Sequence, residues 1–156
     1  MAGTILPKTT FALETHSARG LYMKYATTPA PEVPHRLEFS EPDINNPYAK
    51  FQAEAATDPR YVHLKCLCVD KYISRPNERY AWIVAGADQP DEDTSSWSCT
   101  LWEPEFVRFE DQNIVIRLLH LQYGHYALNE RTLYVSKGEA PEEKTHLALF
   151  TVIDLE

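Results

Sequence analysis

The chain has 156 residues, of which 44% are hydrophobic and 24% are charged, and its formal net charge is −8 at pH 7. This length fits one hydrophobic core, so we expect a single domain over residues 1–156. The composition is unlike that of disordered chains, and the negative charge argues against nucleic acid as a partner. The apolar runs fall far short of the roughly 20 residues that cross a bilayer, so we expect no membrane insertion.

The N-terminus lacks the basic and apolar regions of a secretory signal, and the cysteine count is odd. Both features favour a cytoplasmic or nucleocytoplasmic protein without disulfides. Cys66 and Cys68 lie two apart in an expected strand, where a metal site with His63 or Cys99 can be imagined. Metal sites of this kind usually have four ligands at fixed spacings, so we favour buried free thiols and predict no metal.

In chain order, the first predicted elements are hairpins that recur three times. A turn residue is followed two positions later by tyrosine in the segments 20–25, 70–75 and 124–129, which contain Tyr22, Tyr72 and Tyr126. Upstream of each tyrosine, apolar residues alternate as in a strand with one buried face. These residues are Phe11 and Leu13, Val62 and Leu64, and Ile116 and Leu118. Each pattern predicts two strands joined by a tight turn.

A second pattern also recurs three times, with an aromatic residue leading into a short segment that contains or ends in an acid. The aromatic residues are Phe51, Trp102 and Phe150, about 50 residues apart. Three such units of about four short strands each predict an all-β fold, a β-trefoil with pseudo-threefold symmetry. A propeller has a similar period but typically needs at least four blades. No stretch of helical periodicity exceeds two turns.

Polar, turn-rich segments separate these units, at residues 27–35, 41–48, 86–96 and 137–145. The run 88–94 carries several carboxylates, which could in principle hold calcium. It lacks the glycine and the distal glutamate of a calcium-binding helix–loop–helix, so we favour a solvated acidic loop.

No catalytic arrangement can be picked out by spacing. The chain has no glycine-rich phosphate loop and no His-Glu-x-x-His sequence. His120 and His125 could meet across a hairpin, where structural hydrogen bonding is the favoured role. The carboxylates are numerous enough for a glycosidase pair, but nothing singles one out. We therefore expect no enzyme and no cofactor.

A set of short motifs carries a family resemblance. They are Val62-His63-Leu64-Lys65, Lys71-Tyr72, Trp82-Ile83, Gln89-Pro90-Asp91-Glu92, Ser96-Trp97-Ser98-Cys99-Thr100-Leu101, Arg117-Leu118-Leu119-His120 and Gly124-His125-Tyr126. In this order they resemble the N-terminal agglutinin domain of the amaranthin-type plant lectins, from about Phe39 to Asp154. The resemblance implies a β-trefoil lectin that recognises N-acetylgalactosamine (GalNAc) or galactosyl-GalNAc, the T-antigen disaccharide.

The resemblance also bears on assembly. Family members with two such domains bind the sugar in a shallow site between the N-terminal domain of one subunit and the C-terminal domain of the other. This chain holds one domain, so a second copy would have to supply the missing wall. We therefore expect a head-to-tail homodimer, with glycans of glycoproteins as its ligands.

The sugar-contacting stretch of the family contains an asparagine followed closely by Tyr-Trp, and the matching segment here runs from Arg75 to Trp82. Trp82 matches directly, whereas Ala81 replaces the family tyrosine and Arg79 the asparagine. The candidate carbohydrate-binding residues are Arg75, Asn77, Arg79, Tyr80 and Trp82.

This set has a chemical rationale of its own. A pyranose packs its apolar face on an aromatic ring, and its hydroxyls need planar donors and acceptors. Tyr80 and Trp82 would share one face of a strand, after a turn that carries Asn77 and Arg79. The alternative for Trp82 is that it plugs the barrel.

Aromatic residues outside this stretch are expected to be structural. They are Trp97, Trp102, Tyr72, Tyr126 and the neighbouring His125. Two functions compete with the lectin prediction: a protein-interaction or inhibitor module with little sugar binding, and a scaffold module that once belonged to a longer chain, because fold alone does not fix function. Secreted, disulfide-linked inhibitors and basic heparin-binding factors both fit this acidic, cysteine-poor chain badly.

Overall fold

The computed structural model describes residues 6–7, 9–16, 19–27, 34–79, 82–122, 125–129, 133–135 and 149–155. Within this part of the chain the fold is all-β, as predicted. The elements are β1 (Phe11–Thr15), β2 (Tyr22–Tyr25), β3 (Leu37–Glu41), a 3₁₀ turn η1 (Pro47–Ala49), β4 (Phe51–Ala55), β5 (Val62–Cys66), β6 (Lys71–Ser74), β7 (Val84–Ala87), β8 (Leu101–Glu110), β9 (Asn113–His120), β10 (His125–Asn129), β11 (Leu133–Val135) and β12 (Phe150–Asp154). Among the residues described, no helix is long and apolar enough to span a membrane.

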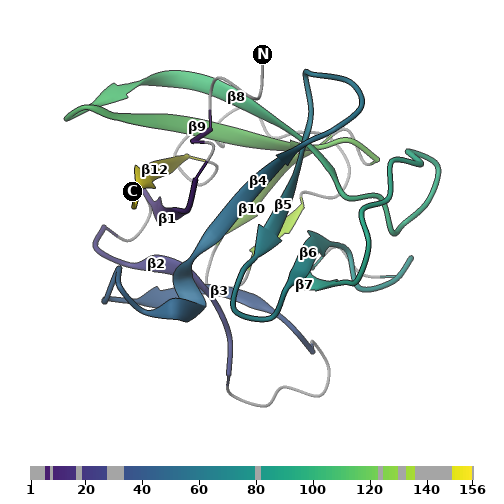
Figure 1. Ribbon diagram of the computed structural model, residues 1–156, viewed down its shortest axis with the longest axis horizontal. Coiled ribbons are helices and arrows are strands. Elements are labelled where there is room, and N and C mark those ends of the chain that lie inside the picture. Colours follow the sequence, from purple (N-terminus) through teal and green to yellow (C-terminus); the bar gives the residue numbers. More distant parts are fainter. Residues whose placement is uncertain are drawn as a thin grey trace.

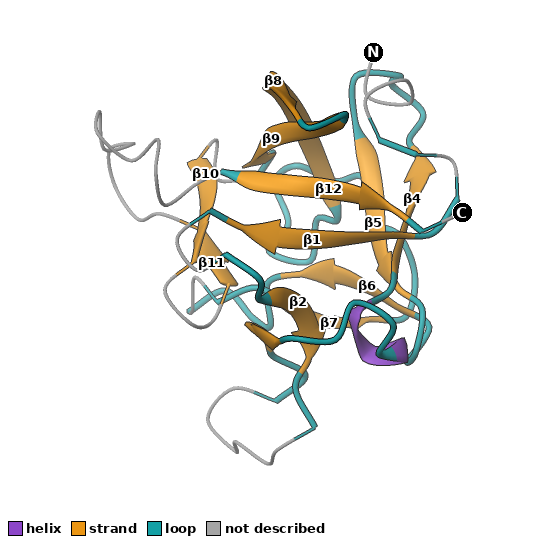
Figure 2. Ribbon diagram, turned by 90° about the vertical axis from the view of Figure 1, so that its left-hand side faces the viewer, coloured by secondary structure: helices purple, strands orange, loops and turns teal. Residues whose placement is uncertain are grey.

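Six of these strands close into an antiparallel barrel (Figure 1). The order is β1, β4, β5, β8, β9 and β12, and β12 pairs again with β1. The closing pair runs in register from Phe11 opposite Asp154 to Thr15 opposite Phe150. Figure 2 shows β1 and β12 as neighbouring strands of the barrel wall. Each of these six strands therefore has a strand partner on both sides, although β1 and β4 meet at one position only.

Three further strand pairs, β2–β3, β6–β7 and β10–β11, extend from barrel strands β1, β5 and β9. The predicted hairpins are therefore confirmed at all three tyrosines. Gly20 and Asp70 have positive φ angles of 83° and 57°, which is the backbone conformation that tight turns demand. His120 and His125 pair directly across the β9–β10 turn, as the spacing suggested.

The barrel interior is filled by the aromatic residues of the second repeated pattern. Phe51, Trp102 and Phe150 are fully buried, as is Phe11. The Trp102 indole N–H donates to the carbonyl of Ile73 at 3.2 Å, and its ring lies edge-on to His120 at 4.8 Å. The alternating apolar residues of β1, β5 and β9 are buried as predicted, but Ala12 and His63 between them are buried as well. At these positions β1 and β5 are therefore covered on both faces, whereas in β9 the intervening Arg117 is half-buried.

The prediction of a β-trefoil with pseudo-threefold symmetry is wrong for the described residues, which form a closed six-stranded barrel with additional strands of unequal size. The β4–β5 hairpin has strands of 5 and 5 residues, whereas β8 and β9 have 10 and 8. The contacts that join the units also differ: β1–β4 has one paired position, β5–β8 two and β9–β12 three. The repeated motifs mark turns and core positions only, so they could not reveal this inequality.

The β8–β9 hairpin projects beyond the barrel (Figure 1). It turns at Asp111 and Gln112, whose φ angles of 48° and 73° match the type I′ turn that suits twisted strands. Phe106 and Phe109 lie near its tip at 45% and 69% exposure, with ring centroids 5.1 Å apart. The hairpin thus carries an exposed apolar pair outside the core.

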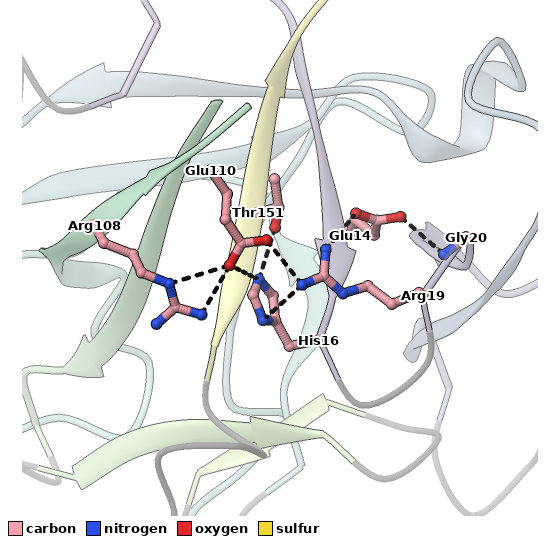
Figure 3. A network of polar contacts seen from close by, with 7 residues as sticks. All are labelled: Glu14, His16, Arg19, Gly20, Arg108, Glu110 and Thr151. Atoms are coloured by element: carbon pink, nitrogen blue, oxygen red, sulfur yellow. Dashed lines mark hydrogen bonds and ion pairs between the residues drawn. The ribbon is translucent and has the colours of Figure 1, made fainter. Parts of the chain in front are cut away.

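A polar network ties this hairpin to the β1–β2 turn (Figure 3). The Glu110 carboxylate accepts hydrogen bonds from Arg19 and Arg108, each at 2.8 Å, and these bonds lower its pKa to about 2. His16 hydrogen-bonds to Thr151 of β12 at 2.9 Å, and burial lowers its pKa below 6.5. The network therefore joins three segments that are distant in the sequence.

We expect Trp102→Ala to lower the free energy of unfolding by about 3 to 5 kcal/mol, because it opens a cavity in the barrel and leaves the Ile73 carbonyl without its indole partner. Urea denaturation followed by circular dichroism measures the change. The matched control is the exposed Trp97→Ala, which should stay within about 0.5 kcal/mol of the wild type. Equal losses in the two variants would contradict the assignment of Trp102 to the core.

The Glu110 network should make stability depend on pH in acid. Because the folded-state pKa is depressed to about 2 from 4.5, the carboxylate stabilises the fold above pH 4.5, and this contribution disappears as the pH falls toward 2. The difference in unfolding free energy between wild type and Glu110→Gln should shrink over that window. Glu103→Gln, on the same strand but with no ion pair to a described residue, should show no such trend.

Candidate functional site

The segment 75–82 leaves β6 and leads toward β7, so the barrel-bound hairpin sets its position. Arg75 at its start is only 2% exposed. Its guanidinium donates to the Gln122 side-chain oxygen at 2.6 Å and to the Glu78 carbonyl at 2.9 Å. Arg75 therefore anchors the segment to the turn after β9.

The middle of the segment is an exposed polar turn. The Asn77 side-chain oxygen accepts the backbone N–H of Arg79 at 2.9 Å, which fixes the turn, and the Arg79 side chain is exposed. Trp82 is 36% exposed, so it does not plug the barrel; Trp102 does. Tyr80 and Ala81 lie outside the described residues, as does the strand expected around them.

A cleft of about 490 Å³ opens on one side of this segment, between the β6–β7 hairpin and the loop 88–98. Its lining residues are Pro34, His35, Ser74, Arg75, Pro76, Val84, Gly86, Ala87, Asp88, Gln89, Pro90, Asp91, Trp97 and Ser98. The structure thus brings Arg75 to the cleft, whereas Asn77, Arg79 and Trp82 do not line it. Pockets for small molecules commonly have about 300 to 1,000 Å³, so the cleft has a suitable size.

The polar groups of the cleft are held in place from within the loop. One Asp91 carboxylate oxygen accepts from the Ser98 hydroxyl, and the other accepts from the backbone N–H of Asp93 at 2.9 Å. The Thr100 hydroxyl contacts the backbone N–H of Asp91 at 2.8 Å. Asp88 forms an ion pair with Lys71 of β6. The cleft therefore presents fixed acceptors.

Trp97 was expected to be structural, yet it is 39% exposed and forms part of the cleft wall, whereas Trp102 and Tyr72 are buried as expected. The side chains of Tyr126 and His125 lie outside the described residues. The sequence did not single out Trp97, Asp91 or Gln89 as residues that line a cleft. The available signal was a tryptophan flanked by serines inside a turn-rich segment, where packing partners are few.

The acidic loop is not merely solvated, because Glu92 fastens it to the barrel. The Glu92 carboxylate lies 3.0 Å from His63 Nε2 and accepts from the Thr57 backbone N–H at 3.1 Å. These two hydrogen bonds hold the pKa of Glu92 below 4.5. His63 is buried in β5, and its Nδ1 contacts the Thr100 hydroxyl at 2.7 Å. The buried imidazole thus contacts the middle of the loop at Glu92 and Thr100 just beyond its end.

The cysteines are free, and only two of them match the predicted burial. Cys66 and Cys99 are buried, but Cys68 is exposed in the turn after β5, with its sulfur 3.5 Å from that of Cys66. Burial raises the pKa of the Cys66 thiol. His63 is already engaged by Thr100 and Glu92. In the described part of the chain, no cluster of three metal-ligating side chains is found.

The exposed Trp82, the polar turn three residues before it in the chain and the cleft walled by Trp97 have the chemistry that polar, partly apolar ligands need. Comparison with protein families gives a match to the agglutinin domain over residues 5–140. The chain therefore belongs to the agglutinin-domain family, a family of carbohydrate-binding lectins that are typically non-catalytic. The match confirms the sequence resemblance and begins closer to the N-terminus than expected. Comparison with curated protein sequences gave no match.

We expect Glu92→Gln to loosen the loop 88–98, because a neutral amide is a weaker acceptor for His63 and the Thr57 amide. Hydrogen exchange should show faster exchange at the Thr57 amide in the variant, with no change in the β1–β12 pair. Asp93→Asn is the control, since its carboxylate bonds only within the loop. Unchanged exchange at Thr57 would mean that Glu92 does not fasten the loop.

Proposed function

We propose that this protein is a lectin for GalNAc or galactosyl-GalNAc glycans that acts without catalysis. The observation that carries the proposal is the exposed indole of Trp82, three residues along the chain from the polar Asn77–Arg79 turn, in a chain of the agglutinin-domain family. An exposed indole offers an apolar face for the pyranose ring, and the turn offers planar groups for its hydroxyls. Arg75 supports this surface by holding the Glu78 carbonyl.

We further propose that two copies complete the site as a head-to-tail homodimer in the cytoplasm or nucleocytoplasm. A shallow surface makes few hydrogen bonds to one sugar, so useful affinity for a glycoprotein requires two or more sites acting together. A dimer with unlike contacting patches would place a wall opposite Trp82 and also supply this second site.

A protein-interaction role is the second candidate, and a specific observation favours it. Phe106 and Phe109 expose an apolar pair on the projecting β8–β9 hairpin, and exposed apolar patches often mark partner-binding surfaces. This role would not need Trp82.

We expect Trp82→Ala to reduce binding to GalNAc-containing glycans at least tenfold, because the stacking surface is lost, while the unfolding midpoint stays unchanged. Glycan-array binding measures the first effect, and light scattering of the same sample measures the mass in solution. Phe109→Ala, which removes a more exposed aromatic ring elsewhere, is the control and should bind as the wild type does. A folded wild type that binds no glycan would favour the protein-interaction role.

A further inference from the structure

The cleft between the β6–β7 hairpin and the loop 88–98 has features that the proposed surface at Trp82 does not use. Its lining includes Trp97, Asp91, Gln89 and the buried Arg75, but not Trp82, Asn77 or Arg79. It is formed entirely by one chain. A ligand in this cleft would therefore need no second subunit.

We propose that this cleft is a second carbohydrate-binding site, which takes one neutral pyranose unit against Trp97. The inference rests on the proposed lectin function and adds a site to it. The cleft volume of about 490 Å³ accommodates a single ring with its ordered water. Trp97 is 39% exposed at the wall, so its indole offers the apolar surface that a sugar ring needs on one side.

The loop 88–98 offers hydrogen-bond acceptors for the hydroxyl groups of the sugar. A carboxylate has about four acceptor positions, and Asp91 uses two of them for Ser98 and the Asp93 amide. The remaining positions can accept from two adjacent hydroxyls. We find no hydrogen bond between the Gln89 side chain and another described residue, so its amide can both donate and accept.

Charge selects neutral sugars over acidic ones. Two carboxylates, Asp88 and Asp91, line the cleft together with one guanidinium, that of Arg75. The guanidinium already donates to Gln122 and the Glu78 carbonyl. Asp88 is already paired with Lys71, which leaves Asp91 as the lining carboxylate without an ion pair to a described residue. The carboxylate of a uronic acid placed at Asp91 would meet its negative charge and lose affinity.

The cleft can also be closed without touching Trp97. Gly86 lies in its wall, and a β-carbon at this position would meet Val84 and His35 at 3.6 to 3.8 Å, which is ordinary van der Waals contact. Gly86→Val therefore fits the strand and places its methyl groups in the ligand space.

The test is a titration of the full-length protein with galactose, GalNAc, glucose and glucuronic acid, followed by ¹⁵N NMR of the indole N–H groups. The three tryptophans report separately: Trp97 for the cleft, Trp82 for the other surface and the buried Trp102 as an internal control for the fold. We expect a neutral sugar to shift the Trp97 signal and leave that of Trp102 in place, and glucuronic acid to bind at least tenfold more weakly. Gly86→Val should raise the Kd measured from the Trp97 signal at least tenfold, and Gln89→Ala should raise it about threefold. Neither variant should change the response of the Trp82 signal.

The outcomes separate the two proposals. A response at Trp82 but not at Trp97 overturns the cleft site and leaves the lectin function standing. A Trp97 response that persists in Gly86→Val also overturns the cleft site. A response at Trp97 that is lost in Gly86→Val supports the cleft whatever Trp82 does. If neither the Trp82 nor the Trp97 signal shifts with any of the sugars, the cleft site is overturned and the result counts against the lectin function as well.

Discussion

The pairing of β12 with β1 is the constraint on which the rest of the structure depends. It joins residues near the two ends of the described chain and turns an open sheet into a barrel. Closure gives Phe11, Phe51, Trp102 and Phe150 a common interior, where their side chains leave water together. Strands β1, β5 and β9 are held on both sides by this closed wall, so the hairpins and loops that leave them start from fixed positions.

The candidate sites are placed by this wall rather than by their own packing. His63 is an example: it is buried in β5, and its two ring nitrogens contact Glu92 within the acidic loop and Thr100 just after it. Arg75 does the same for the segment 75–82 through Gln122 and the Glu78 carbonyl. Exposed aromatic side chains can then face solvent on loops that remain ordered, which is the condition for recognising a ligand with few contacts.

Patterns local in the sequence were the ones that predicted structure correctly. A turn residue before tyrosine located three hairpins, and alternation at Phe11, Val62 and Ile116 located buried strand positions. The long β8–β9 hairpin was not predicted from the sequence, because its turn uses Asp111 and Gln112 at positive φ instead of a glycine pair. The threefold symmetry was inferred from the spacing of motifs, which says nothing of strand length between them.

The sequence by itself determined the all-β class, the hairpins, the main core aromatics and the agglutinin-domain family, because turn chemistry and apolar periodicity act over a few residues. Only the tertiary structure decided which tryptophan fills the barrel and which ones face solvent. Local sequence left Trp82 open between sugar contact and core, whereas Trp102 is enclosed because β5 and β9 pair with β8 from distant parts of the chain. The cleft beside Arg75 likewise exists only because the folded barrel brings residues 34–35, 74–76, 84–91 and 97–98 around one space.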